Sequence, residues 1–154
     1  MNAKTTIRII LILFISGSLV YLAVDTFSFG NDGEKLKTPP VETGYVMYYF
    51  SQGKDCTTCD NIEAYAYEVL NTHFAAQLKD TTLVWQKVDT DQPEHEHFNT
   101  DFNLYTKSIV LVQYENGEHV KWENLEKVWD LVYEKPAYSD YIKSRTTDFL
   151  SEAE

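Results

Sequence analysis

Apolar residues gather in one long run near the start of the chain and then in short runs separated by polar segments. The long run, residues 7–24, has no charged side chain after Arg8, and its 18 residues would reach about 27 Å as a helix, close to the hydrocarbon thickness of a bilayer. The short runs alternate between continuous apolar stretches, typical of buried strands, and a three-to-four-residue period, typical of amphipathic helices. The pattern predicts a membrane-spanning helix followed by an α/β domain.

The charges around the long apolar run predict its orientation. Lys4 and Arg8 stand at its start, and Asp25 follows it. By the positive-inside rule the N-terminus stays in the cytoplasm and the domain lies on the extracytoplasmic side, which is the periplasm in a Gram-negative cell. A cleaved signal peptide is the alternative. We favour an uncleaved anchor, because the run is long for a signal core and no A-x-A-like cleavage site follows it.

Composition divides the chain into three parts. Residues 1–25 form the predicted anchor. Residues 26–43 contain Gly, Pro and charged side chains without a period and are predicted to be a linker. Residues 44–154 form one domain, since their number suffices for a single core.

The domain is predicted to contain four strands and four helices. An Asn116-Gly117 pair between two apolar runs is a strong signal for a tight hairpin. Asp91 to Glu94, with Pro93 between them, resembles the capping box of a short helix. The predicted strands are 45–50, 83–88, 108–114 and 118–122; the predicted helices are 62–78, 93–102, 125–132 (stopped by Pro136) and 138–150.

This order predicts a central mixed sheet of four strands flanked by helices. The first half is a β-α-β unit, whose two strands run parallel, and the second half contains an antiparallel hairpin. Cys56 and Cys59, the two cysteines of the chain, follow the first strand at the start of the first helix.

Charge excludes one class of function. The chain carries 13 basic and 24 acidic residues, a net charge of −11. Lys4 and Arg8 stand at the N-terminal end of the chain, where no acidic residue precedes Asp25, so the rest of the chain is more acidic still. Such a surface repels nucleic acid, and we therefore exclude a DNA or RNA partner.

The C-x-x-C spacing of Cys56 and Cys59 leaves three interpretations. A four-cysteine zinc site lacks its second pair, and two cysteines so close together do not form a disulfide framework. The pair can be a redox dithiol, part of a metal site, or a structural feature of a subunit in a membrane complex. Its place between a strand and a helix favours the redox dithiol.

From Tyr45 onward the chain resembles thioredoxin-like proteins, and most closely the exported ArsF-like family, described as a nitrophenyl-compound nitroreductase subunit. The resemblance implies a thioredoxin-like fold in which Cys56 is the exposed, attacking sulfur and Cys59 the buried, resolving one. No flavin or nicotinamide fingerprint is present, so no organic cofactor is expected and no nitro-reducing chemistry is carried over. The segments that carry the resemblance are YYF with CTTC, IEAYAYEVL, VDTDQPEHEHF, SIVLVQYENGE and WENLEKVWDLV.

Three departures from ordinary thioredoxins predict a narrow range of partners. Asp55 stands before the first cysteine, where thioredoxins have Trp. Alignment from the Asn-Gly turn places Ile109 at the position of their cis-proline. Residues 45–50 contain no buried acid. We therefore expect one specific dithiol or disulfide protein as partner.

The metal alternative adds histidine to the dithiol. His95 and His97 follow the second strand, whose end should neighbour that of the first, and two thiolates with one imidazole suit copper(I) or zinc. We favour the simpler interpretation, in which both belong to a solvated helix start. His73 is expected in the core, and His119 on the surface.

Overall fold

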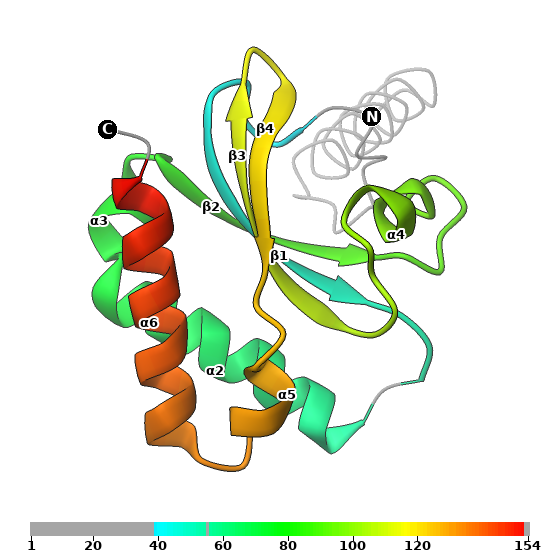
Figure 1. Ribbon diagram of the computed structural model, residues 1–154, viewed down its shortest axis with the longest axis vertical. Coiled ribbons are helices and arrows are strands. Elements are labelled where there is room, and N and C mark those ends of the chain that lie inside the picture. Colours follow the sequence, from blue (N-terminus) through cyan, green and yellow to red (C-terminus); the bar gives the residue numbers. More distant parts are fainter. Residues whose placement is uncertain (1–38, 55, 153–154) are drawn as a thin grey trace, which may run out of the picture. The chain divides into compact units, whose positions relative to one another are not determined.

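The computed structural model describes residues 39–54 and 56–152, which include a single four-stranded sheet. Its order is β2-β1-β3-β4 (Figure 1). β1 pairs with β2 in parallel and with β3 antiparallel, and β3 and β4 form the expected hairpin. The predicted mixed sheet is confirmed. The strands are β1 (Gly44–Ser51), β2 (Leu83–Asp89), β3 (Ser108–Glu115) and β4 (Glu118–Asn124).

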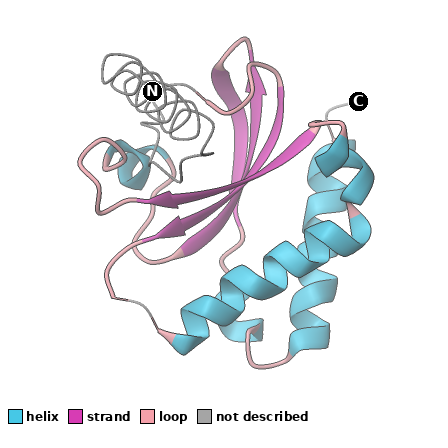
Figure 2. Cartoon of the chain, turned by 180° about the vertical axis from the view of Figure 1, so that it is seen from behind, coloured by secondary structure: helices cyan, strands magenta, loops and turns pink. Residues whose placement is uncertain are grey.

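Helices cover the two faces of the sheet unequally. α2, α5 and α6 lie on one face, and the short α4 lies on the other, as both views show (Figures 1 and 2). The predicted anchor lies outside the described residues. Among the residues that the structure describes, no helix has the length and apolar character needed to cross a bilayer. The helices are α2 (Thr57–His73), α3 (Ala75–Lys79), α4 (His97–Asp101), α5 (Val128–Leu131) and α6 (Lys135–Ser151).

The continuous apolar run of β1 is explained by burial on both faces. Met47 and Tyr49 point to the face covered by α2, α5 and α6. Tyr48 and Phe50, which alternate with them, point to the face covered by α4. All four are at most 2% exposed, as expected for β1, which is one of the two inner strands of the sheet.

The long helix α2 begins at the dithiol and packs against α6. Its apolar stripe follows helical spacing, with Ile62, Ala66 and Leu70 fully buried. Tyr138 of α6, also fully buried, donates its hydroxyl to the carbonyl of Ile62 at 2.7 Å. This contact holds α6 against the first turns of α2, close to the cysteines.

The first helix is shorter than its sequence period predicts. Phe74 leaves helical geometry (φ −124°, ψ 23°), so the expected helix to residue 78 is two helices, α2 and α3. Phe74 instead buries its ring in the core. His73 is the last residue of α2 and is exposed, so its expected place in the core was wrong.

Two further local signals had a different outcome. The expected capping box does not form, since α4 begins only at His97 without a side-chain cap. Pro136 lies in the first turn of α6 and helps to start that helix, in addition to following α5.

The hairpin turn is confirmed, because Asn116 and Gly117 both have positive φ (53° and 81°).

Candidate functional site

The two cysteines lie where the central strand passes into the long helix. β1 ends at Ser51, and a short loop leads to Cys56, which is the N-cap residue of α2. Cys56 and Cys59 form a disulfide with Cα atoms 5.2 Å apart. Cys56 is exposed, whereas Cys59 is 4% exposed. The relative exposure implied by the resemblance is thus confirmed.

The start of α2 provides donors for the exposed sulfur. The backbone N–H of Cys59 donates to Sγ of Cys56 at 3.2 Å. The sulfur therefore occupies the place of an N-cap oxygen, at the positive end of the helix dipole. After reduction, the same position favours a thiolate, which is the nucleophilic form of cysteine.

Beneath Cys59 lies an aromatic side chain in place of an acid. The hydroxyl of Tyr49, on β1, donates to the carbonyl of Cys59 at 3.3 Å. Nζ of Lys87, on β2, lies 5.5 Å from the Tyr49 ring centroid and 2.7 Å from Glu63 Oε2 on α2. As expected from the sequence, no β1 carboxylate lies here, and the phenol ties the strand to the first turn of the helix.

The end of β2 fixes the loop before the dithiol. The carbonyl of Ser51 accepts the backbone N–H of Thr90 at 2.8 Å and its hydroxyl at 3.2 Å. The N–H of Gly53 donates to Oδ2 of Asp91 at 2.6 Å. Gly53 has φ +65°, a conformation that favours glycine. Asp91, expected to cap a helix, holds this loop instead.

A buried lysine fixes the same loop from the other side. Lys107, directly before β3, is 5% exposed and donates from Nζ to the carbonyl of Lys54 at 3.0 Å. Its own carbonyl accepts the indole N–H of Trp129 at 2.9 Å. Sequence reasoning missed Lys107, because a lysine between two hydroxyl residues has the composition of an ordinary loop.

Ile109 does not precede the third strand, as the alignment suggested. It lies inside β3, fully buried and paired with Tyr49. The residue before the strand is Lys107, whose amine contacts the dithiol loop. The side chain of Lys107 therefore contacts the dithiol loop from the position directly before β3.

The histidines of the metal alternative are engaged elsewhere. Nδ1 of His95 lies 2.9 Å from the carbonyl of Asp89, and Nδ1 of His97 lies 2.8 Å from Oδ2 of Asp101. Within residues 39–54 and 56–152, no three His, Cys, Asp or Glu side chains form a group that could hold a metal ion. The dithiol and His97 are thus not brought together. His119 is exposed, as expected.

Asp89 at the end of β2 has an environment that stabilises its charged form. Its pKa is lowered by hydrogen bonds from the Gln92 side chain and the Asp91 N–H, with smaller electrostatic contributions from nearby His95 and Lys107. The carboxylate is therefore a fixed negative charge near the loop that precedes the dithiol.

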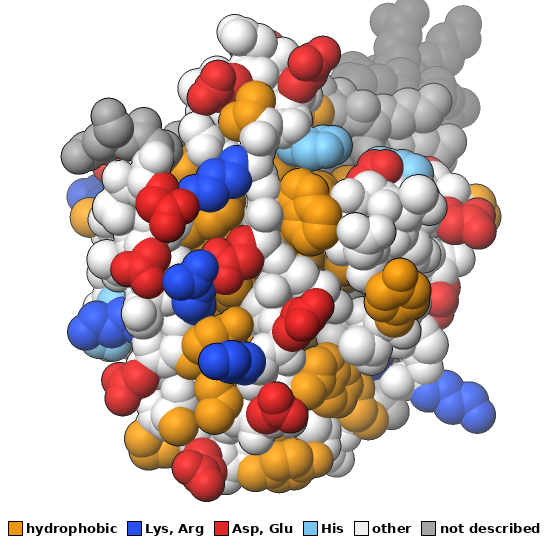
Figure 3. Space-filling model, viewed as in Figure 1, with side chains coloured by type: hydrophobic (Ala, Val, Ile, Leu, Met, Phe, Trp, Pro, Cys, Tyr) orange, Lys and Arg blue, Asp and Glu red, His pale blue; other side chains and the backbone are white. Residues whose placement is uncertain are grey.

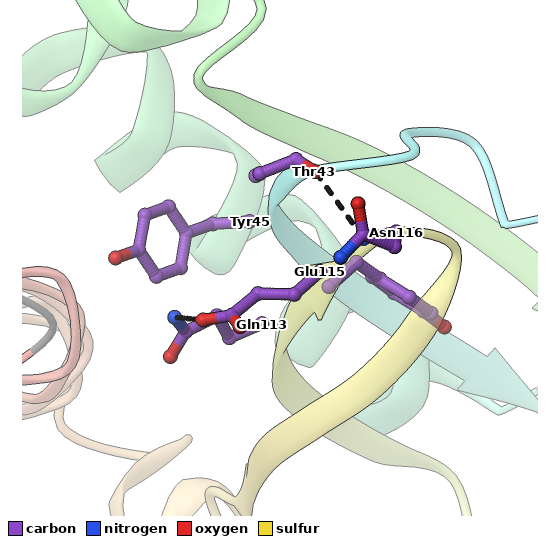
Figure 4. Close-up of a pocket in the computed structure, with 7 residues that line it drawn as sticks. Thr43, Tyr45, Gln113, Glu115 and Asn116 are labelled. Atoms are coloured by element: carbon purple, nitrogen blue, oxygen red, sulfur yellow. Dashed lines mark hydrogen bonds between the residues drawn. The ribbon is translucent and has the colours of Figure 1, made fainter.

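Three pockets lined by described residues include neither cysteine. One, of about 310 Å³, lies at the start of β1 and the hairpin turn, where Thr43 and Asn116 are hydrogen-bonded (Figure 4). That is the end of β1 opposite to the dithiol. Another, of about 330 Å³, lies between α4 and the hairpin. A third, of about 230 Å³, includes Thr106 and Ser108, which flank Lys107.

Charge is distributed over the surface without a single strong patch in the view of Figure 3. Acidic side chains are spread over this face, with basic and hydrophobic side chains among them. The exclusion of a nucleic-acid partner stays a prediction from the net charge of −11.

The strand order and the site together define the class of fold. A parallel β1-α2-β2 unit, an antiparallel β3-β4 hairpin and a closing helix α6 surround a C-x-x-C pair at the start of α2. This is a thioredoxin-like α/β fold with its disulfide at the expected strand–helix junction.

No protein-family model matches the chain, and no curated protein matches it. Similar solved structures include oxidised thioredoxin from Plasmodium falciparum, with 21% identity, coverage of 57% of this chain and 80% of that chain, and a TM-score of 0.36. A reduced thioredoxin pre-protein from Schistosoma mansoni has 20% identity, coverage of 60% and 80%, and a TM-score of 0.36. Thioredoxin f2 from Chlamydomonas reinhardtii has 13% identity, coverage of 62% and 82%, and a TM-score of 0.37.

These likenesses are too distant to carry an argument about chemistry. The fold assignment rests on the sheet order and on the place of the disulfide. The closer resemblance to the ArsF-like family stays a prediction.

Proposed function

We propose that this protein is a membrane-anchored, extracytoplasmic thiol–disulfide exchange or electron-relay protein. The observation that carries the proposal is the disulfide between exposed Cys56 and buried Cys59 at the N-terminus of α2. An exposed sulfur at this position is accessible to a partner, and its thiolate is stabilised by backbone donors.

The proposed exchange needs only the two sulfurs and the partner. The Cys56 thiolate attacks a partner disulfide, forming a mixed disulfide and releasing one partner thiolate. The Cys59 thiolate then attacks Sγ of Cys56, forming the intramolecular disulfide and releasing the second partner thiolate. The partner gains two electrons and this chain loses two. The same steps in reverse oxidise a partner dithiol.

The partner is proposed to be one specific protein. Lys107 and Asp91 contact the loop of residues 51–54 before the dithiol, and the sequence lacks the Trp and the cis-proline expected of ordinary thioredoxins. An unusual surface next to the reactive sulfur supports a narrow range of partners. An ArsF-like redox pathway would be a suitable setting, with electrons passing through Cys56 and Cys59.

Anchoring and location are proposed from residues 7–24. Their apolar length suits a single span, and Lys4 and Arg8 suit a cytoplasmic N-terminus. If membranes are prepared from expressing cells, the protein should resist alkaline carbonate extraction. Protease added to the extracytoplasmic side should degrade the domain. Full extraction by carbonate would contradict the anchor, and protection of the domain from protease would contradict its extracytoplasmic location.

The test of the exchange chemistry is to trap the intermediate. A Cys59→Ser variant cannot resolve the mixed disulfide, so it should form a covalent partner adduct that reductant releases. Cys56→Ser is the matched control, since it keeps one cysteine only four per cent exposed and should form no adduct. Equal trapping by both variants, or by neither, would overturn the proposal.

A further inference from the structure

The pocket between α4 and the hairpin has the features of a ligand site that is separate from the dithiol. Its volume is about 330 Å³, within the range of pockets that hold small molecules. It lies on the face of the sheet that α4 covers, and neither cysteine is among the described residues that line it (Figure 2). Its hydroxyls, charges and rings each restrict what it can bind.

Two buried tyrosines line the pocket and share one hydrogen bond. Tyr48 on β1 is 1% exposed, Tyr114 on β3 is 5% exposed, and their hydroxyl oxygens lie 3.1 Å apart. Burial raises the pKa of both, so both hydroxyls keep their hydrogens at neutral pH. One bond between two hydroxyls uses only one of their two hydrogens, and within the described residues the second has no acceptor. Because a buried O–H without an acceptor costs free energy, a molecule in the pocket that carries an acceptor removes this cost.

With histidine neutral, the charged groups that line the pocket are acidic. Glu94 and Asp101 line it, and none of the described residues around it is Lys or Arg. Oδ2 of Asp101 lies 2.8 Å from Nδ1 of His97. Burial, and then the charge of Asp101, raise the pKa of Tyr114, so this carboxylate lies close to the tyrosine hydroxyls. The pocket is therefore complementary to a cation.

Six of the ten described residues that line the pocket carry an aromatic or imidazole ring. The ring centroids of Phe98 and Phe102 lie 5.9 Å apart, and that of Tyr48 lies 5.8 Å from Phe98. The imidazoles of His97 and His119 lie 4.1 Å from Phe98 and 5.5 Å from Phe102. Aromatic rings attract organic cations, quaternary ammonium groups above all. A metal ion needs convergent ligands instead, and within the described residues no three His, Cys, Asp or Glu side chains form such a group.

We propose that this pocket binds a small organic cation that carries a quaternary ammonium group and a hydroxyl group. The rings contact the methyl groups on nitrogen, and the carboxylates of Glu94 and Asp101 balance the positive charge. The tyrosine pair donates its second hydrogen to the ligand hydroxyl. A quaternary nitrogen has no N–H group to satisfy, so it suits walls made mainly of rings. The proposal does not depend on the exchange function of the dithiol.

Three ligands separate the charge from the hydroxyl group. Choline has both groups, 3,3-dimethylbutan-1-ol has the same shape with carbon in place of nitrogen, and tetramethylammonium lacks the hydroxyl. Each is titrated into the full-length protein by calorimetry at low ionic strength, in a sugar-based detergent that carries no ammonium group. Choline should bind at one site with a Kd of about 1 mM or below, and the neutral alcohol at least about tenfold more weakly.

Two sets of variants test the residues that line the pocket. A Glu94→Gln, Asp101→Asn double variant should weaken choline binding by about tenfold. Glu96→Gln is the matched control, because Glu96 is an exposed acid of the same segment outside the pocket, and it should change the Kd by less than about twofold. A Tyr48→Phe, Tyr114→Phe double variant removes both hydroxyls without leaving a partner unpaired. It should weaken choline by about fivefold and leave tetramethylammonium binding unchanged.

Several outcomes would overturn the proposal while leaving the exchange function standing. One is equal affinity for choline and its neutral isostere, and another is no saturable choline binding up to about 50 mM. An equal loss in Glu96→Gln would attribute the binding to the acidic surface in general. Lys35 and Lys37 precede Pro39, which lines the pocket. Choline binding that appears only in a Lys35→Gln, Lys37→Gln double variant would assign the pocket to the chain's own lysines.

Discussion

The two faces of the sheet are built differently. On the face covered by α2, α5 and α6, aliphatic and aromatic side chains from several helices close the core, and Tyr49 reaches Cys59. On the face covered by α4, stacked and tilted rings dominate, such as Phe50 and Phe102 at a centroid separation of 5.6 Å. Within the described residues, this second face gives neither cysteine a hydrogen bond.

The difference separates stability from chemistry. Residues on both faces stabilise the fold, because both are buried. Only the face covered by α2 is connected to the sulfurs, through Cys59 and Tyr49. We therefore expect changes on the α4 face to alter unfolding but not the dithiol, and changes on the α2 face to alter unfolding and the dithiol together.

The largest expected effect comes from truncating one core residue on each face. Phe102→Ala should lower the unfolding free energy by about 3–5 kcal/mol, and Ile62→Ala by about 2–5 kcal/mol, because both side chains are at most 1% exposed. Only Ile62→Ala should also shift the glutathione equilibrium, by more than about threefold. In the reduced protein the disulfide no longer holds the first turn of α2, so this turn depends more on the packing of Ile62. Denaturant unfolding and redox titration measure both. A shift of equal size in Phe102→Ala would break the comparison.

The next effect appears at alkaline pH on both faces. Burial raises the pKa of Tyr48 on one face and of Tyr138 on the other. As pH rises above the ordinary tyrosine pKa of about 10, the unfolded chain loses these protons and the folded chain keeps them, so stability is lost. Tyr48→Phe and Tyr138→Phe should each reduce that loss by about 1.4 kcal/mol per pH unit.

Urea unfolding in steps from about pH 10 upward measures this slope. Tyr105→Phe is the control, since Tyr105 is 91% exposed and should leave the slope unchanged. If Tyr48→Phe and Tyr138→Phe also leave it unchanged, burial does not hold these hydroxyls in their neutral form.

A smaller effect distinguishes the two ends of the sheet. Gly53 in the dithiol loop and Gly117 in the hairpin turn both have positive φ, and an added Cβ would meet no atom within 4 Å at either site. Alanine should therefore cost about 1–2 kcal/mol at each, from backbone strain alone. Gly53→Ala should also slow reduction by dithiothreitol, whereas Gly117→Ala should not. Equal reduction rates would show that the loop does not position Cys56.

The smallest effect is expected at the surface. Arg145 of α6 forms a bidentate pair with Glu123 of β4, with both N–O distances at 2.8 Å. The pair is partly exposed, so Arg145→Met should cost at most about 1 kcal/mol, and less at high salt. Thermal unfolding at two salt concentrations would show it. A salt-independent loss larger than this would mean that the aliphatic stem contributes most of the stability.

The strands could be predicted from the sequence because their signals are local. Each predicted strand lies within its observed bounds, and the Asn116-Gly117 turn forms as its residues require. Hydrophobic periodicity could not locate the break at Phe74, because apolar residues continue at helical spacing through Leu78. The break depends on the burial of the Phe74 ring, which is a tertiary contact.

The candidate site was predictable only in part for the same reason. Its sulfurs follow from the spacing of Cys56 and Cys59, but the residues that hold their loop come from distant segments. Asp91 resembles a helix cap locally, yet its carboxylate binds Gly53, which is 38 positions away. Lys107 contacts Lys54 across 53 positions, and no local pattern marks such a pair.

The most direct test is the relative reactivity of the two sulfurs in the reduced wild-type protein. Limiting iodoacetamide is added at pH 7, and mass spectrometry of the peptides gives the alkylation rate at each cysteine. Cys56, exposed at the helix N-terminus, should react at least about tenfold faster than Cys59, which is 4% exposed. Equal rates, or a faster reaction at Cys59, would contradict the assignment of Cys56 as the attacking sulfur.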